Sequence, residues 1–550
     1  MLKKFGLYLV SVAAVVFLFT LIGGREPDDA VAAFAPVKNG VNNPASSRKN
    51  NLVVTCNAYS GTINPLYLET EADREIVRLV FDPLVEPGEG GAPVPVLADY
   101  TVSQDGRKYT FTLKEGAVFS SGDRVTADDV LFTWEVLCDP TYAGHLRPAE
   151  LGIVGYRAYV EGSATTLSGV EVVDERTLSV TLEEPSAAAL FTLGVAPLSR
   201  AYYGTDFAWG RLDNLLLQRS RPMGCGQYRL TAMTMELLTL ERNKNYYLGA
   251  PSVPTVYFKV ATPELAAAMM KEGACDLDLT GGSDSLEVAG LDHLVRTETA
   301  GDSYGLLGFS CQSALLKDPA VRRAVALCID RQALIDAVFG AGGAKPLTLP
   351  VSAASFAAPA EPPAARHDPA AAVALLEQAG YVRNSGGIFV KEGVTLSLTF
   401  TTTDNNPASA ALGDLLQDGL AKAGIGLTRR SLDYGSLLNQ IRLGRCEMWF
   451  MAMGFSPDPD PTALIGSGGT FNLFGYSAEK VDDLLARAAA ETDLERRAQL
   501  YDLLWQALSA NPPFVPLYQR VQPVVCNLRV SGLSFQEMRP VTAEFYRIKW

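Results

Sequence analysis

Histidine is scarce in this chain, with His145, His293 and His367 the only three among 550 residues. The eight cysteines form no CxxC pair, and none lies at zinc-ligand spacing from a histidine. Metal sites in proteins are commonly built from such clusters. We therefore expect no metal site and no cofactor. An even number of cysteines in an exported chain permits disulfides, but the sequence does not indicate how they would pair.

Clusters of basic residues are also missing. The chain has 47 Lys and Arg against 61 Asp and Glu, a formal net charge of −14, and the charges are spread without a block of one sign. Nucleic-acid binding depends on clustered Lys and Arg, so we expect no nucleic-acid partner. With 48% hydrophobic and 20% charged residues the composition is globular. The length suggests two to four domains or one large multi-lobed body.

Motifs of hydrolytic enzymes are absent as well. The sequence contains neither GxSxG nor HExxH. Its one SxxK match, Ser477 to Lys480, stands at the start of a predicted helix and is more simply an N-cap. A secreted hydrolase stays an alternative of a different class, but we expect that the protein is not an enzyme.

The N-terminus carries an export signal. Lys3 and Lys4 precede an apolar run over residues 5–23, which is long enough to span a bilayer. A small-x-small motif occurs only at Ala30 to Ala32, far from that run. Residues 1–24 are therefore either a cleaved signal peptide or an uncleaved membrane anchor. Both alternatives place the rest outside the cytoplasm, in the periplasm or at the outer face of the membrane. Residues 25–50 are expected to form a flexible tether.

The stretch WFMAMGFSPDPDPT, residues 449–462, combines an apolar run with a proline-rich acidic loop. This pattern predicts a strand that delivers polar groups to a cleft, because proline restricts the loop to few conformations. Asp458 could then meet a cation such as the free amine of a ligand. The alternative is an ordinary Asp-Pro turn, which local chemistry alone favours.

Several motifs follow one another in an order that resembles a known family. Gln104 to Arg107 predicts a hairpin, followed by a helix that begins after Thr126. The chain resembles the extracytoplasmic solute-binding proteins, family 5, that serve bacterial ABC importers of peptides and nickel. The likeness covers about residues 51–535 and is carried by Asn64-Pro65, Asp82 to Val85, Pro95 to Ala98, Asp105-Gly106 with Tyr109, Phe111 and Leu113, Phe119, Gly122, Thr126 to Val130, and segments 169–185, 224–228, 240–251, 315–335, 367–381 and 494–518.

The resemblance implies an α/β, two-lobed periplasmic-binding-protein fold of the cluster C type. Two strands would hinge the lobes, and an extra domain would be inserted in the first lobe. Mapped by matching segments, lobe I takes residues 51–81, 169–261 and 521–550, the inserted domain takes 82–168, and lobe II takes 262–520. The resemblance also implies closure of the hinge around a buried ligand.

In function, the resemblance implies capture of short peptides in the interlobe cleft and their delivery to the permease subunits of an ABC transporter. We expect a monomer that contacts the membrane through its N-terminal segment. Asp458 occupies the place of the carboxylate that pairs with a peptide amine, and the other ligand-binding candidates are Gly454, Phe455, Ser456, Tyr304 and Ser310. The same fold could instead bind a nickel chelate, an oligosaccharide or a signalling peptide.

Overall fold

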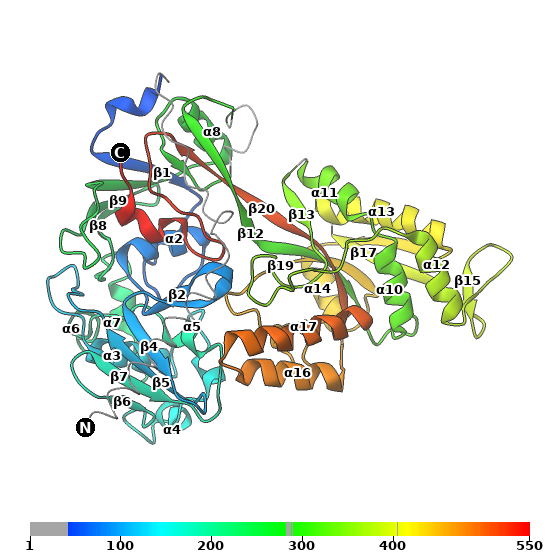
Figure 1. The fold of residues 1–550 in the computed structure, drawn as a ribbon, viewed down its shortest axis with the longest axis horizontal. Coiled ribbons are helices and arrows are strands. Elements are labelled where there is room, and N and C mark those ends of the chain that lie inside the picture. Colours follow the sequence, from blue (N-terminus) through cyan, green and yellow to red (C-terminus); the bar gives the residue numbers. More distant parts are fainter. Residues whose placement is uncertain (1–41, 282–287, 289, 341, 404) are drawn as a thin grey trace, which may run out of the picture.

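Figure 1 shows the computed structural model, which describes residues 42–281, 288, 290–340, 342–403 and 405–550. The expectations for residues 1–24, and for the tether up to residue 41, lie outside the described residues. Within the described ranges, no helix combines the length and apolar character needed to cross a membrane.

Two long strands join the two lobes of the molecule. β12 (Leu294–Phe309) and β20 (Phe514–Asn527) pair antiparallel and run from the first lobe into the second (Figure 1). Their register shifts between Gly305 and Leu306 and breaks more widely between Ala300 and Tyr304, where Gly301, Asp302 and Ser303 leave the β12–β20 ladder. Because paired strands are stiff where their ladder is complete, this break is the natural place for a hinge.

One large sheet spans both lobes, with β12 and β20 at its centre. On the second-lobe side β12 is followed by β19 (Met448–Gly454), β17 (Ser397–Thr403) and β18 (Gly426–Leu432). On the first-lobe side β20 is followed by β11 (Leu277–Asp278), β1 (Asn51–Cys56), β10 (Thr255–Val260), β9 (Leu237–Arg242) and β8 (Tyr228–Met233). The predicted apolar strand before Phe455 is therefore β19, which lies beside a hinge strand.

A four-stranded sheet forms the inserted part of the first lobe. Its order is β4 (Ala98–Val102), β5 (Lys108–Leu113), β7 (Thr177–Thr181) and β6 (Val170–Val172). The predicted hairpin before Lys108 joins β4 to β5, and α3 (Ala127–Leu137) begins after Thr126 with a capping box, so both predictions are confirmed. Phe111 of β5 packs edge-on against Trp134 of α3, with ring centroids 5.7 Å apart.

The strand pairing leads us to propose different positions for two of the expected domain boundaries. β6 and β7 complete the inserted sheet, so the insertion extends beyond residue 168. α8 (Pro263–Lys271) and β11 pack in the first lobe, where β11 pairs with β1 and β20, so residue 262 does not begin the second lobe. We propose that the first lobe continues to the break in β12. The inserted sheet also shares one continuous apolar core with the first lobe.

The second lobe contains two apolar cores. One lies under α10 (Pro319–Leu327), α11 (Arg331–Phe339), α12 (Pro369–Gln378) and α13 (Pro407–Ala423). The other collects around Trp449 and Trp505, between α14 (Tyr434–Arg442), α16 (Glu479–Ala490) and α17 (Leu494–Ala510). Both cores pack against the central sheet, so the second lobe is built around β12, β19 and the start of β20.

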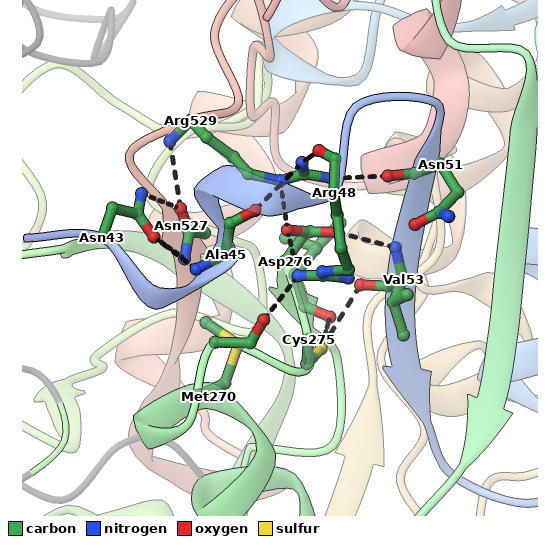
Figure 2. A network of polar contacts seen from close by, with 12 residues as sticks. Asn43, Ala45, Arg48, Asn51, Val53, Met270, Cys275, Asp276, Asn527 and Arg529 are labelled. Carbon is green, nitrogen blue, oxygen red and sulfur yellow. Dashed lines mark hydrogen bonds and ion pairs between the residues drawn. The ribbon is translucent and has the colours of Figure 1, made fainter.

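The chain just after the undescribed N-terminal residues is bound to the first lobe, as Figure 2 shows. Asn43, before the short 3-10 helix η1 (Pro44–Ser47), exchanges hydrogen bonds with the Asn527 side chain. Arg48 and Arg529 both donate to the buried carboxylate of Asp276, each over 2.7 Å, and the Val53 amide donates to it over 2.8 Å. The expected flexible tether is therefore wrong for residues 43–48, because these side-chain contacts hold them in place.

We expect Asp276→Ala to lower the free energy of unfolding by about 3–5 kcal/mol, the usual effect of breaking a buried ion pair. The reason is that Arg48 and Arg529, whose side chains are only 21% and 10% exposed, would lose their counter-ion. Urea denaturation followed by tryptophan fluorescence measures the loss. Asp483→Ala is the matched control, because Asp483 pairs with Arg487 on the surface of α16 and should cost less than about 0.5 kcal/mol. Equal losses in the two variants would show that Asp276 does not clamp the segment.

Candidate functional site

A cavity of about 550 Å³ lies between the lobes. The first lobe supplies α2 (Glu71–Val80) and β2 (Val85–Pro87) to its wall, and the inserted part supplies residues 145–147 and Glu150. The hinge residue Asp302 and the loop Phe455 to Asp458, which follows β19, complete it. Groups from both lobes and from the hinge thus surround one space.

A smaller cavity of about 290 Å³ lies on the second-lobe side of the same loop. It shares Phe455, Ser456 and Asp458 with the larger cavity and is otherwise lined by residues that include Tyr304, Gly454 and Met453. Five of the six predicted ligand-binding residues therefore line one or both of these cavities. Their roles toward a ligand stay predictions.

The aromatic residue of the loop has a partner inside the protein. The rings of Phe455 and Tyr304 stack with centroids 4.7 Å apart and an angle of 22° between their planes. The Phe455 amide donates to the carbonyl oxygen of Asp302 over 2.6 Å. Tyr304 is buried, and burial raises the pKa of its hydroxyl. This pair joins the loop to β12 immediately beside the hinge.

Asp458 lies in the loop after β19 and lines both cavities, but an arginine of the same lobe already neutralises its charge. Both terminal amino groups of Arg497, on α17, donate to its carboxylate over 2.7 and 2.8 Å. Only 7% of Asp458 and 3% of the Arg497 side chain are exposed. Burial opposes the charge of Arg497, but the hydrogen bonds and the charge of Asp458 prevail and hold the pKa of Arg497 above its ordinary value. The structure thus gives Asp458 a different partner from the expected ligand amine.

The second aspartate of the loop stabilises a turn. Asp460 accepts a hydrogen bond from the Thr462 amide over 2.9 Å at the start of α15 (Thr462–Ile465). Its pKa is raised, chiefly by burial and further by the neighbouring charge of Asp458. These contacts fix the direction in which the chain leaves the cavity wall.

Ser310, the sixth ligand-binding candidate, is not among the residues that line the two cavities. It follows the second-lobe end of β12 and is buried, and its amide donates to the carbonyl oxygen of Glu447 over 2.8 Å. The strand runs from the hinge into the core of the second lobe, and this direction carries Ser310 away from the ligand space.

Several charged residues outside the predicted set also line the larger cavity, among them Asp302 and Arg147. Asp302 is half-buried, and its carboxylate has no hydrogen-bond or ion-pair partner among the described residues. Arg147 donates to the carbonyl oxygens of Gly144 and Leu146, over 2.9 and 3.2 Å, and pairs with no carboxylate of the described chain. The sequence does contain a feature from which Asp302 could have been predicted. The segment AGDS, residues 300–303, places polar residues directly before the apolar segment 304–309.

None of the eight cysteines lines either cavity. All eight lie in the described ranges as free thiols, and seven are buried. Burial raises the pKa of Cys275 and of Cys56 to about 12, so these thiols stay protonated at neutral pH. No group of three or more metal-ligating side chains occurs among the residues that the structure describes.

Comparison with known proteins places this geometry in context. A family profile described as "Bacterial extracellular solute-binding proteins, family 5 Middle" matches residues 92–473. Di/tripeptide-binding protein 4 of Pseudomonas aeruginosa (strain UCBPP-PA14) is 29% identical over 480 residues, which cover 82% of this chain and 85% of that protein.

Two solved structures show the same fold. The oligopeptide-binding protein AppA from Bacillus subtilis, in complex with a nonapeptide, has a TM-score of 0.66 and 21% identity, covering 90% of this chain and 98% of AppA. NikZ from Campylobacter jejuni, in complex with Ni(L-His), has a TM-score of 0.67 and 23% identity, covering 92% and 100%. The expected α/β fold of the periplasmic binding proteins is confirmed.

We expect Arg497→Met to lower the free energy of unfolding by about 3–5 kcal/mol, because it leaves the carboxylate of Asp458 buried without a counter-ion. The double variant Asp458→Asn/Arg497→Met removes both charges. Its loss should be clearly smaller than the sum of the two single losses. Denaturant titrations of the four proteins measure this coupling. Strictly additive losses would mean that the two side chains do not depend on each other.

Proposed function

Because the chain belongs to the bacterial extracellular solute-binding proteins of family 5, we propose that it captures short peptides between its lobes and delivers them to the permease of an ABC importer. Members of this family bind solutes and are not enzymes, which confirms the expectation that this chain has no catalytic role. The family is extracellular, and we propose that this chain also works outside the cytoplasm.

The observation that carries the proposal is the charge pattern of the interlobe cavity. A volume of about 550 Å³ lies within the range of roughly 300–1,000 Å³ that is typical of small-ligand sites. Its wall presents the half-buried Asp302 and the exposed Arg147, neither of which has a counter-ion in the described chain. A short peptide carries an ammonium group at one end and a carboxylate at the other, so it can neutralise both.

Similar proteins support the choice of ligand class. The relative from Pseudomonas aeruginosa is named a di/tripeptide-binding protein, and AppA was solved with a nonapeptide. NikZ was solved with Ni(L-His), so the fold also accepts other solutes. In this chain His145 is the one histidine in the wall of the larger cavity. We therefore propose a peptide before a nickel complex.

Closure of the lobes would enclose the ligand. Backbone hydrogen bonds connect the lobes at two places, from Phe356 to the carbonyl of Gly90 and from Ala187 to the carbonyl of Ala489, each over 2.8 Å. The Ser352 hydroxyl of the second lobe also donates to the Glu537 carboxylate, so these contacts would have to break for the lobes to separate about the hinge in β12. Enclosure excludes water, so the cavity charges would act on a ligand in a less screened environment.

We expect native mass spectrometry of the full-length chain to show bound peptides of mixed sequence and narrow length after gentle purification. Peptides released by denaturation and identified by sequencing would set the size of the cleft. Adding such a peptide at 100 times its dissociation constant should raise the free energy of unfolding by about 2.7 kcal/mol.

A single non-peptide mass would contradict the proposal. Its composition would then decide among the alternatives of the same fold, namely a nickel chelate, an oligosaccharide or one signalling peptide. Peptides that bind without any stabilisation would bind the unfolded chain as tightly as the native one, which would contradict a site formed by the fold.

A further inference from the structure

Four carboxylates line the larger cavity, and two of them are neutralised within the protein. Glu86 is held by Arg78 and by Arg539, and Asp458 is held by Arg497. Glu150, on the short 3-10 helix Pro148–Leu151, is exposed to solvent. The remaining carboxylate, Asp302, is half-buried and unpaired within the described chain. Of these four carboxylates, Asp302 alone is both partly buried and without an ion-pair partner among the described residues.

Asp302 lies beside the loop in which the sequence predicted the amine site. Its carbonyl oxygen accepts a hydrogen bond from the Phe455 amide, and the next residue, Ser303, pairs with Gly454 across the β12–β19 ladder. We infer that Asp302, rather than Asp458, binds the cationic group of the ligand, which for a peptide is the free α-amine. This inference rests on the proposed function and adds the residue that recognises the charge.

Physical reasons favour Asp302 over its two competitors. Transferring Asp458 to a ligand would leave Arg497 buried without its counter-ion, and an unpaired buried charge is strongly unfavourable. The charge of Glu150 faces water, where ions and solvent screen it. Asp302 gains a partner on binding and loses none.

The position of Asp302 also links recognition to movement. It stands in the break of the β12–β20 register, between the first-lobe and second-lobe parts of β12. A ligand cation bound there would touch the hinge itself. Binding at Asp302 would therefore bias the hinge toward the closed arrangement, in which the loop after β19 faces the first lobe.

The test uses a synthetic mixture of tripeptides with free amino termini and the same mixture after N-acetylation. Native mass spectrometry of the full-length chain measures the dissociation constants. We expect acetylation to weaken binding to the wild type roughly 10- to 100-fold, the usual effect of losing one charge-assisted hydrogen bond. Asp302→Asn should weaken binding of the free tripeptides by a similar factor and change binding of the acetylated mixture little.

Glu298→Gln is the matched control, because it removes the same charge from the same strand while Glu298 pairs with Arg296 outside the cavity. Glu150→Gln tests the exposed competitor. Unchanged tripeptide binding in Asp302→Asn, or an equal loss in Glu298→Gln, would overturn the inference, as would a loss confined to Glu150→Gln. In all three results the wild type still binds tripeptides, so the proposed function stands. Failure of the wild type to bind either mixture would instead remove the proposed function and the inference together.

Discussion

The antiparallel pairing of β12 with β20 is the constraint on which the rest of the structure depends. These two strands form the centre of the sheet that spans both lobes, and each lobe completes its own part of the sheet around them. In the second lobe two glycines let large rings lie directly on β12. A Cβ atom at Gly305 would stand 2.5 Å from the Tyr518 ring, and one at Gly308 would stand 2.6 Å from the Trp449 ring. This close packing restricts movement of the rings against the second-lobe part of β12, whereas residues 301–303 lie outside the β12–β20 ladder.

The ion pair between Asp458 and Arg497 follows from the same geometry. β19 is paired with β12 and delivers the loop Phe455 to Asp458 to the hinge, where a loop with buried charge needs internal partners. Arg497 supplies that partner from α17, and its guanidinium also lies near the rings of Phe356 and Tyr501, 5.8 and 5.4 Å from their centroids. The loop is thereby fixed before any ligand arrives. A preformed wall lowers the ordering entropy that binding must overcome, so the ligand can meet an already shaped cavity.

Local sequence patterns predicted the elements that depend on local interactions. The hairpin before Lys108, the capped start of α3 and the strand that ends at Gly454 all follow from turn chemistry, capping and apolar runs. The predicted loop also lines the cavities. The sequence does not indicate which residues and strands that lie far apart in the chain will pair with each other. Arg497 follows Asp458 by 39 residues, and β11 joins β1 and β20 from opposite ends of the chain. Such pairings are decided by packing of the whole fold, which no local pattern contains.

The hydrogen bonds and ion pairs around Asp276 fix the first lobe, rather than the second, to residues 43–48. Asn43 and Arg48 bind Asn527 and Asp276, and Arg529 closes the network (Figure 2). All three partners lie on the first-lobe side of the break in β12, in β20 or next to β11 and β20. Residues 43–48 are therefore fixed to the first lobe. Bending at residues 301–303 would move the second lobe relative to this segment and to the first lobe. The carboxylate of Asp302 lies between the two, so a ligand bound there would be contacted by both the fixed and the moving part of the molecule.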